Sequence, residues 1–271
     1  MTAADGRPVD PPPIAFLPPI TVLVDYDGTI CLTQVTDELM VDFAETDEWK
    51  HLDELYLRGE IGSRAELAQL VAWLPTEREP VMAAAAAQPH DATFVDFVAL
   101  ARSTGIEIEI VSDGYGFYVE PALARLGVSG LPIATAETTW ASGGPEIRFP
   151  FGHPECFLCG TCKRNRVLHH RGRRRYVVLV GDGTSDRFAA AHADTIFAKA
   201  PLSDWCDAEG WAYRRWSTFR DISTWLAGIV EDPSRLDARN DRPFICGPEV
   251  WGPGRALPPH PDEGPGSPPH D

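Results

Sequence analysis

The sequence predicts an α/β fold, in the form of a doubly wound, mostly parallel sheet with an inserted helical cap and a β-hairpin insertion. Two patterns favour this class. Apolar runs with the composition of buried parallel strands alternate with amphipathic helical stretches. Acidic or hydroxyl side chains directly follow three of these runs, and in open α/β sheets the functional site lies at the carboxyl ends of the strands.

Four apolar runs are predicted as buried strands. Helical stretches separate them, for example Phe94–Arg102, Val119–Leu126 and Arg187–His192. In the second run, Glu107 and Glu109 alternate with isoleucines, which indicates a half-exposed strand rather than one covered on both faces. The predicted strands are Ile20–Val24, Ile106–Val111, Tyr176–Val180 and Thr195–Ala198.

A long segment without a clear strand separates the first run from the second. It extends from Thr33 to about His90 and contains several helical stretches joined by Pro and Gly breaks. Because it is too long for a simple crossover, we predict a helical cap over residues 33–90. The α/β core then comprises residues 20–32 and 91–231.

Prolines gather at the two ends of the chain. Of 25 prolines, 6 lie in residues 1–19 and 10 lie in residues 232–271. Such segments cannot fill a helix or a central strand and bury little apolar surface. We therefore expect disordered or loosely draped Pro-rich tails over 1–19 and 232–271.

The charge balance bounds the kind of partner. The chain of 271 residues has 24 Lys and Arg against 40 Asp and Glu, a formal net charge of -16, which disfavours nucleic acid or an anionic membrane as a partner. No stretch approaches the roughly 18 apolar residues of a membrane span, and the N-terminus lacks the order of a signal peptide. We expect a cytoplasmic protein that acts on a small molecule.

Two carboxylates end the first predicted strand. Asp25 and Asp27 follow its apolar residues and precede Gly28 and Thr29. Because side chains alternate along an extended chain, both carboxylates point the same way and repel each other unless a cation lies between them. Mg²⁺ is the oxygen-seeking ion that fits this need. Taken alone, the segment would also fit an Asx-rich turn.

The next two strands end in similar groups. Ser112, Asp113 and Gly114 offer a hydroxyl and backbone N–H groups suited to phosphate oxygens, although an ordinary strand-to-helix turn fits them equally well. Asp182 and Asp186 follow the third strand, four residues apart. Asp186 alone could be an acid favoured in the first turn of a helix, whereas Asp182 has no such explanation.

A basic segment leads into the third strand. Residues 163–175 include seven basic residues and no acid. We expect most of its arginines, Arg164 and Arg166 among them, to form a solvated helix face. Lys163 is the exception, because a phosphate site needs one fixed ammonium group.

In chain order, Asp-x-Asp-Gly-Thr, a serine, a lysine and Gly-Asp-x-x-x-Asp resemble the four motifs of the haloacid dehalogenase superfamily. Most members of that superfamily are Mg²⁺-dependent phosphatases with an aspartate nucleophile. The helical insert after the first motif resembles the cap of the phosphoserine phosphatase type. Finer patterns resemble the branch that contains 2-hydroxy-3-keto-5-methylthiopentenyl-1-phosphate phosphatase. They are Tyr56-x-x-Gly59-x-Ile61-x-Ser63-Arg64, Phe117-Tyr118-x-x-Pro121, Cys159-Gly160-x-Cys162-Lys163, Phe197-Ala198-Lys199 and Trp205-Cys206.

The resemblance implies roles in catalysis and metal binding. Asp25 would attack phosphorus and form an aspartyl-phosphate, and Asp27 would serve as general acid and base. Mg²⁺ would be held by Asp25, the backbone carbonyl of Asp27 and Asp182. Asp186 would complete this site by orienting Lys163 or a metal-bound water.

The resemblance also implies roles in binding the substrate. Lys163, Ser112 and backbone N–H groups around Asp27, Gly28 and Gly114 would stabilise the phosphoryl oxygens. Thr29 would fix the loop that holds the phosphate, and Arg64 in the cap would contact the organic part of the substrate.

Residues Leu131–Cys162 are predicted as a second insertion. It begins with a β-hairpin formed by Ile133–Trp140 and Glu146–Phe151, which Ser142-Gly143-Gly144-Pro145 joins. A cysteine-rich loop follows the hairpin.

This loop places four soft-metal ligands within ten residues: His153, Cys156, Cys159 and Cys162. Three interpretations stay open, namely a metal-free structural loop, a structural Zn²⁺ site, and an iron–sulfur loop with a distant fourth ligand such as Cys206. The spacing is unusual for zinc, and the loop belongs to the ordinary pattern of the branch that the chain resembles.

The predicted function is hydrolysis of a small phosphorylated metabolite. A phosphoryl transferase or mutase on the same fold is the enzymatic alternative, and a metal-binding scaffold with a vestigial site is the non-enzymatic one. A dehalogenase is disfavoured because those relatives lack the second carboxylate, which is Asp27 here.

Overall fold

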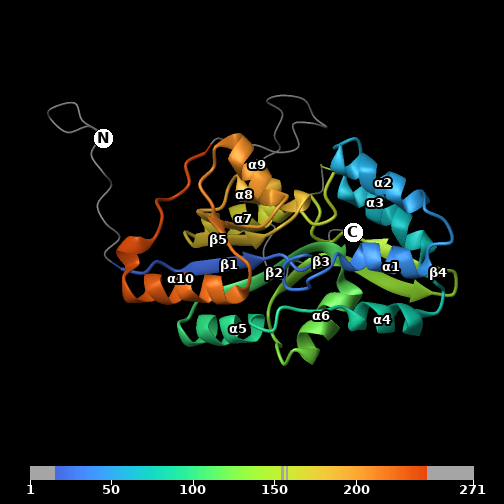
Figure 1. The fold of residues 1–271 in the computed structure, drawn as a ribbon, viewed down its shortest axis with the longest axis horizontal. Helices are drawn as coiled ribbons and strands as arrows, with labels where there is room; N and C mark the ends of the chain where they lie inside the picture. Colours follow the sequence, from blue (N-terminus) through green and yellow to red (C-terminus); the bar gives the residue numbers. More distant parts are fainter. Residues whose placement is uncertain (1–15, 154–155, 157, 243–271) are drawn as a thin grey trace.

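The computed structural model describes residues 16–153, 156 and 158–242. Within these residues the chain forms a seven-stranded sheet in the order β4-β3-β2-β1-β5-β6-β7 (Figure 1). All neighbouring strands are parallel except β3 and β4, which are antiparallel. The predicted fold class is thereby confirmed. The strands are β1 (Ile20–Val24), β2 (Glu107–Tyr115), β3 (Ile133–Ala141), β4 (Gly144–Arg148), β5 (Tyr176–Gly181), β6 (Thr195–Ala198) and β7 (Arg214–Arg215).

The predicted hairpin is present as β3–β4, and its first strand also belongs to the main sheet. We predicted the hairpin as the start of an insertion, whereas β3 pairs in parallel with β2 through Ile110 and Ile133. The first half of β3 is therefore a strand of the main sheet, and only its end and β4 extend beyond it. The two-residue strand β7 was not predicted, because two arginines give no strand pattern.

Helices cover both faces of the sheet (Figure 1). Alternation along β1 separates two cores. Val22 and Val24 belong to the apolar cluster that includes Phe94 and Phe219, and Leu23 belongs to the cluster that includes Val167 and Ala189. None of the helices in the described ranges has the length and apolar composition of a membrane span. One face carries α5 (Phe94–Ser103), α6 (Gly116–Arg125) and α10 (Phe219–Glu231), and the other carries α7 (Lys163–Gly172), α8 (Arg187–Ala190) and α9 (Leu202–Glu209).

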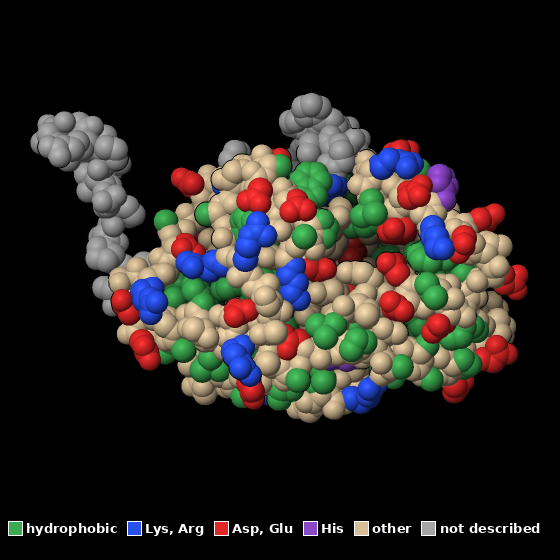
Figure 2. Space-filling view, in the orientation of Figure 1, with side chains coloured by type: hydrophobic (Ala, Val, Ile, Leu, Met, Phe, Trp, Pro, Cys, Tyr) green, Lys and Arg blue, Asp and Glu red, His purple; other side chains and the backbone are tan. Residues whose placement is uncertain are grey.

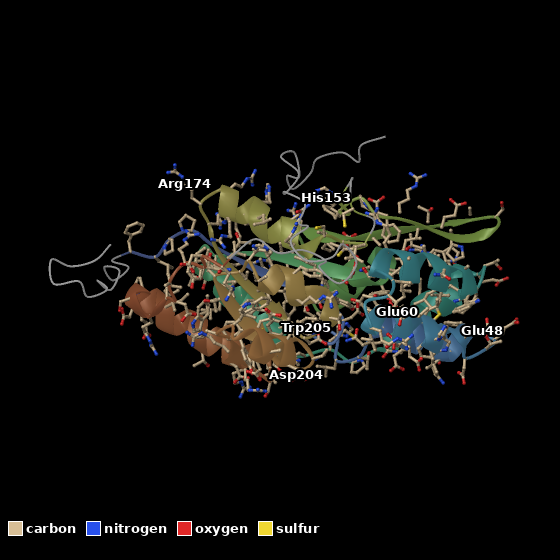
Figure 3. The ribbon with its side chains drawn as sticks, turned by 90° about the horizontal axis from the view of Figure 1, so that it is seen from above. Glu48, Glu60, His153, Arg174, Asp204 and Trp205 are labelled. Atoms are coloured by element: carbon tan, nitrogen blue, oxygen red, sulfur yellow. The ribbon has the colours of Figure 1, made fainter. Side chains whose placement is uncertain are left out.

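Residues 33–90 are helical, as the sequence indicated. The hairpin β3–β4 extends beside these helices (Figure 3). Trp140 Nε1 donates a hydrogen bond to the carbonyl oxygen of Pro75 at 3.2 Å. The hairpin thus supports this helical segment from the side of the sheet. The elements are α1 (Val35–Phe43), α2 (Glu48–Leu57), α3 (Ser63–Leu70), the 3-10 helix η1 (Val71–Trp73) and α4 (Arg78–Ala87).

A buried ion-pair network corrects two expectations about exposure. Arg164 and Arg166 in α7 are each only 2% exposed, so they do not belong to a solvated face. Arg166 donates to Glu109 at 2.7 and 3.2 Å, and His170 Nε2 lies 2.6 Å from the same carboxylate. Because α7 covers β2, Glu109 is buried, and β2 is not the half-exposed strand that alternation indicated. Glu107 is exposed.

Electrostatics explain why Glu109 is tolerated inside the protein. Burial alone would raise the pKa of Glu109, but hydrogen bonds from His170 and Arg166 outweigh it and lower the pKa below its usual value. The glutamate therefore stays ionised and fixes α7 against the sheet.

Ordered contacts continue past residue 231, the predicted end of the folded body. A 3-10 helix η3 spans Pro233–Arg235. Asp237 accepts hydrogen bonds from Arg214 and Thr195, and Arg242 donates to the carbonyl oxygens of Ala190 and Ala193. Residues 232–242 thus pack on the body, and most of both predicted tails lies outside the described residues.

We expect Glu109→Gln to lower the free energy of unfolding by about 3–5 kcal/mol, because it leaves Arg166 buried without its charge partner. Glu107→Gln is the matched control on the same strand. Glu107 is 59% exposed and pairs with Arg175, so its loss should cost less than about 1 kcal/mol. Urea denaturation of both variants measures the difference. Equal stability of the two variants would contradict the proposed structural role of Glu109.

Candidate active site

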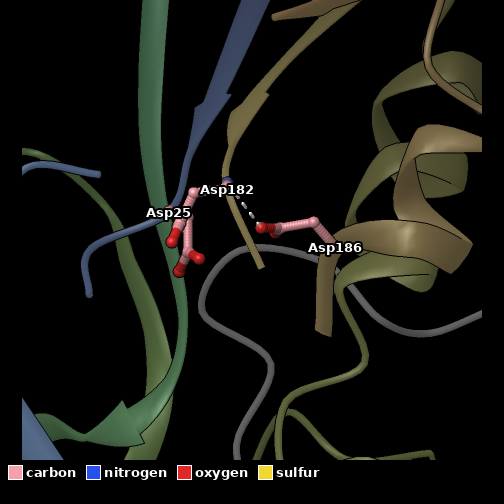
Figure 4. Close-up of side chains that lie close together, drawn as sticks. All are labelled: Asp25, Asp182 and Asp186. Carbon is pink, nitrogen blue, oxygen red and sulfur yellow. Dashed lines mark hydrogen bonds between the residues drawn. The ribbon is translucent and has the colours of Figure 1, made fainter. Parts of the chain in front are cut away.

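Three buried carboxylates meet at the carboxyl edge of the sheet. Asp25 follows β1 and Asp182 follows β5, and these strands are parallel neighbours in which Val24 pairs with Val180. Asp186 approaches from the short helix η2 (Thr184–Asp186) (Figure 4). Ligand oxygens of Asp25, Asp182 and Asp186 all lie within 4.8 Å of one another. The predicted convergence of strand ends is therefore observed.

Lys163 lies between two of these carboxylates. Its Nζ is 2.8 Å from Asp25 Oδ1 and 2.8 Å from Asp186 Oδ1, and it donates to Ser185 Oγ at 2.8 Å. Burial alone would lower the pKa of Lys163, but the charges of Asp186 and Asp25 outweigh it and raise the pKa. Lys163 therefore remains a cation although its side chain is 2% exposed.

The nucleophile predicted at Asp25 has a buried carboxylate. Burial raises its pKa well above the usual range, the charges of Asp186 and Asp182 add to this, and Lys163 opposes it. The backbone N–H of Tyr26 donates to Asp25 Oδ1 at 2.8 Å. A cation at this position would favour the ionised form that a nucleophile needs.

The other two carboxylates are held by neighbouring groups. Asp186 Oδ2 accepts from the backbone N–H of Asp182 at 3.2 Å (Figure 4). It also accepts from the backbone N–H of Gly183 at 3.1 Å. Asp182 accepts from Thr29 Oγ1 at 2.8 Å and from Gln34 Nε2 at 3.2 Å. Burial, with the charge of Asp186, raises the pKa of Asp182 to about 7. Thr29 is fully buried, and its hydroxyl thus orients Asp182.

Asp27 lies apart from this cluster and has its own donors. Its Oδ1 accepts from the backbone N–H of Val35 at 3.0 Å, and its Oδ2 accepts from Tyr118 Oη at 2.9 Å and Ser112 Oγ at 3.4 Å. Burial raises the pKa of Asp27 to about 6, although these hydrogen bonds lower it in part. Such a value allows the group both to give and to take a proton near neutral pH.

Gly28 and Gly114 allow the backbone to approach these carboxylates. Gly28 has a φ of +69°, and a Cβ there would lie 2.0 Å from Asp182 Oδ2. A Cβ on Gly114 would lie 2.0 Å from the Tyr118 hydroxyl. A side chain at Gly28 would displace the carboxylate of Asp182, and one at Gly114 would displace the hydroxyl of Tyr118.

A cavity of about 270 Å³ opens above the carboxylates. Its floor includes Asp25, Asp27 and Asp182, and helices of the segment 33–90 supply the facing wall. Four of the predicted site residues do not line this cavity, namely Thr29, Ser112, Lys163 and Arg64. The lining residues are Asp25, Asp27, Gln34, Thr36, Asp37, Asp53, Tyr56, Leu57, Ser63, Glu66, Leu67, Leu70, Asp113, Gly114, Asp182, Gly183, Thr184, Ser185 and Pro201.

The described part of the loop after the hairpin joins the helical segment to the sheet. The backbone N–H of Gly160 donates to Ser63 Oγ at 3.1 Å, and that of Thr161 donates to Asp113 Oδ1 at 2.6 Å. The backbone N–H of Arg64 donates to the carbonyl oxygen of Leu158 at 3.1 Å. Asp113, which we predicted to be near phosphate, therefore ties β2 to this loop while it lines the cavity.

Arg64 points elsewhere than predicted for a substrate contact. Its guanidinium lies 5.3 Å from the centre of the Phe149 ring, and its Nη2 lies so close to Gly152 that a Cβ there would clash at 1.6 Å. The side chain is thus packed against the segment that follows β4.

The zinc site is not supported. Among the residues that the structure describes, only Asp25, Asp182 and Asp186 form a group of three or more potential ligands within 4.8 Å. The set His153, Cys156, Cys159 and Cys162 does not. His153 and Cys156 are buried, and Cys156 packs with Leu158 and Phe188.

Several site residues had no assigned role in the sequence. Tyr118 binds Asp27, Gln34 binds Asp182, and Ser185 binds Lys163. Lys199 donates to the carbonyl oxygen of Gly28 at 3.2 Å, with its ammonium 3.8 Å from the centre of the Trp216 ring. Tyr118 and Lys199 belong to sequence motifs of the branch that the chain resembles, and these motifs could have indicated a role in the site. No motif in the sequence indicated such a role for Gln34 or Ser185.

Comparison with known proteins agrees with this geometry. A model of the haloacid dehalogenase-like hydrolase family matches residues 22–191. The 2-hydroxy-3-keto-5-methylthiopentenyl-1-phosphate phosphatase of Exiguobacterium sibiricum is 29% identical over 217 residues, covering 75% of this chain and 94% of that protein. The protein of the same name from Brevibacillus brevis is 27% identical over 220 residues, covering 79% of this chain and 97% of that protein.

Solved structures share the fold at low identity. A phosphoserine phosphatase solved as a phospho-aspartyl intermediate analogue has a TM-score of 0.59 and 17% identity, covering 77% of this chain and 99% of that one. A haloacid dehalogenase family hydrolase from Salmonella enterica serovar Typhi has a TM-score of 0.62 and 15% identity, covering 79% of this chain and 72% of that one. The resemblance seen in the motifs is confirmed: the chain belongs to the haloacid dehalogenase-like hydrolase family.

Proposed function

We propose that this protein is a Mg²⁺-dependent phosphomonoester hydrolase that acts on a small phosphorylated metabolite through an aspartyl-phosphate at Asp25. One observation carries the proposal. Asp25 is a buried carboxylate at the floor of a cavity, fixed by Lys163, and Asp27 lies two residues away with a pKa of about 6. The relatives named above as phosphatases support the same reaction class.

The carboxylate cluster fits a hard divalent cation. Ligand oxygens of three buried carboxylates lie within 4.8 Å of one another, and Lys163 pairs with only two of these carboxylates. Oxygen ligands are those that Mg²⁺ prefers. We propose that Asp25, the backbone carbonyl of Asp27 and Asp182 hold Mg²⁺. Asp186 would act on the site through Lys163, because its oxygens already accept from Lys163 and from two backbone N–H groups. The bound ion would offset the charges of the nucleophile and the phosphate.

The first half of the reaction transfers the phosphoryl group to the enzyme. A carboxylate oxygen of Asp25 forms a bond to phosphorus while the bond from phosphorus to the ester oxygen breaks. Protonated Asp27 gives its proton to the leaving alkoxide, so that an alcohol departs.

The second half returns the enzyme to its starting state. Asp27, now ionised, takes a proton from a water molecule that attacks phosphorus, and the bond to Asp25 breaks. Phosphate leaves, and Asp27 is protonated again. The Tyr118 hydroxyl and the backbone N–H of Val35 hold Asp27 in place through both transfers.

Residues 33–90 are proposed as a cap that covers the substrate. Helices α1, α2 and α3 form the wall of the cavity opposite the nucleophile. Lys163, Ser112 and backbone N–H groups near Gly28 and Gly114 are proposed to stabilise the phosphoryl oxygens in the transition state.

Asp25→Asn should lower the rate of phosphate release by at least about 10³-fold, because an amide is a poor nucleophile. The experiment measures inorganic phosphate from a panel of phosphate monoesters that includes p-nitrophenyl phosphate. Mass spectrometry should confirm that the variant contains no deamidated, wild-type protein. Near-normal turnover by such a sample would refute the assignment of the nucleophile.

Asp27→Asn should slow hydrolysis of an alkyl phosphate by about 10²- to 10⁴-fold, since an alkoxide needs a proton to leave. The same variant should affect p-nitrophenyl phosphate much less in the first step, because nitrophenolate leaves without a proton. Burst kinetics on both esters separate the two steps. An equal loss of the burst rate on both esters would contradict the role of general acid.

Chelation of divalent cations should abolish turnover, and added Mg²⁺ should restore it. Asp182→Asn should raise the Mg²⁺ concentration for half-maximal rate at least about 10-fold, because one charged ligand is lost. Asp204→Asn on the exposed side of α9 is the control (Figure 3) and should leave the Mg²⁺ dependence unchanged. An unchanged dependence in Asp182→Asn would remove this residue from the metal site.

A further inference from the structure

Residues 237–242, which follow η3, form a strap across the end of α8 that lies away from the active site. Asn240 Nδ2 in this strap donates to the carbonyl oxygen of Ala191 at 2.7 Å. The Arg242 guanidinium donates at 2.9 Å to each of three carbonyl oxygens, those of Ala190, Ala191 and Ala193. The strap thus binds the carbonyl groups at the end of α8 and just after it.

The strap also binds the end of α7 near Arg174, which Figure 3 labels. Arg239 donates to the carbonyl oxygens of Arg174 and Arg175. In the other direction, the Arg171 side chain of α7 donates to the carbonyl oxygen of Asn240. The strap therefore ties the C-terminal ends of α7 and α8 to each other.

The opposite ends of the same two helices carry an ion pair of the candidate site. Lys163 is the first residue of α7, and Asp186 directly precedes α8. Lys163 Nζ lies 2.8 Å from Asp186 Oδ1, and both side chains are buried. With ten and four residues, the two helices are only about 15 and 6 Å long, so a shift at one end of either helix reaches its other end.

Burial explains why α8 depends on the strap. Ala190, Ala191 and Ala193 have no exposed surface, so their carbonyl groups cannot turn to water for a partner. The last carbonyl groups of a helix have no partner within the helix, and a cation suits the negative end of the helix dipole. Without Arg242, the carbonyl groups of Ala190 and Ala193 would lose this donor, which is costly inside a protein. A shift of α8 would relieve that cost.

Arg242 serves the helix end rather than the charge of the surface. The chain has a net charge of -16, and Figure 2 shows Asp and Glu side chains gathered over α1 and α2. Arg242 is half-buried, and its guanidinium lies 5.3 Å from the centre of the Trp211 ring. Among the described residues, the hydrogen bonds of its side chain go to the end of α8.

We propose that Arg242 is a positioning residue of the active site. By holding the end of α8 on the strap, it keeps Asp186 at the distance from Lys163 that places the ammonium group for the reaction. A misplacement of about 1 Å slows a reaction by up to about 10²-fold, even when the substitution is far from the reacting atoms. The inference rests on the proposed phosphatase function and adds a residue outside the range 22–191 that the family model matches.

The test measures hydrolysis of p-nitrophenyl phosphate by the full-length protein with Mg²⁺, at a temperature well below the unfolding midpoint of every variant. Arg242→Ala should lower kcat at least about 10-fold and change KM less than about 3-fold, because the cavity keeps its lining while the ammonium group is misplaced. Arg242→Lys should recover part of the loss, since an ammonium group at the helix end still donates to one or two of the carbonyl oxygens.

A double-mutant cycle separates positioning from a general effect on the structure. Asp186→Asn removes the carboxylate charge through which Arg242 is proposed to act. In the Asp186→Asn background, Arg242→Ala should therefore change kcat less than about 2-fold, whereas independent effects would multiply and give the full loss again. If Arg242→Ala does not fold, Arg242→Lys takes its place in the cycle, with a lower kcat expected only when Asp186 is present.

Arg215→Ala is the matched control. Arg215 of β7 is 70% exposed and pairs with Asp207 on the surface, so its loss should leave kcat unchanged. Circular dichroism and thermal unfolding verify that each variant is folded at the temperature of the assay.

Three results would overturn the inference. An unchanged kcat in folded Arg242→Ala would show that the site does not depend on the strap. An equal fold loss in the wild-type and Asp186→Asn backgrounds would show that Arg242 does not act through Asp186. Either result leaves the phosphatase function intact, whereas a wild-type protein that hydrolyses no ester would refute the proposed function and the inference with it.

Discussion

The ammonium group of Lys163 is the constraint on which the rest of the site depends. Asp25, Asp182 and Asp186 lie within 4.8 Å of one another in a buried place, where like charges cannot all remain ionised without a cation. Lys163 bonds to two of them at 2.8 Å. Because it is the first residue of α7, this contact fixes how the helix docks on β1 and β5. Glu109 of β2 fixes the same helix through Arg166, about one turn after Lys163, and through His170, about one turn further on. The contacts that dock α7 on the sheet therefore also assemble the site.

The part of the site that the sequence could predict is the part that follows from strand ends. Asp25, Asp27 and Asp182 follow apolar runs, and parallel strands bring their carboxyl ends to one edge whatever their order in the sheet. Partners of buried charges could not be predicted this way. Nothing local in Arg166 distinguishes it from exposed Arg173, because its burial depends on Glu109, 57 residues earlier in the chain. The strand β3 was misassigned for a similar reason, since one strand pairs in parallel at its start and in antiparallel at its end.

The segment 33–90 shows how a helical face decides which side chains meet the substrate. Ser63, Glu66, Leu67 and Leu70 recur at helical spacing along α3, and all four line the cavity. Arg64 is two residues from Glu66, so it lies on nearly the opposite side of the helix and packs on Phe149. The motif drew attention to Arg64 because it is charged and distinctive. The apolar periodicity of α3 was the better guide to the inner face, and it points to Glu66.

Three acidic residues, Glu109, Asp113 and Glu66, differ in the partners that the fold supplies to them. Glu109 is as buried as Glu66, and the fold supplies it with Arg166 and His170. Asp113 is half-buried at the same cavity, and the loop supplies it with the N–H of Thr161. Glu66 alone of these three lacks a partner among the described residues, although the same physical cost applies to it. Local rules are broken mainly at functional sites, where the unmet interaction belongs to a bound molecule. The acidic lining of the cavity, which no Lys, Arg or His among its described lining residues balances, is thus a feature of the site rather than of the packing of the fold.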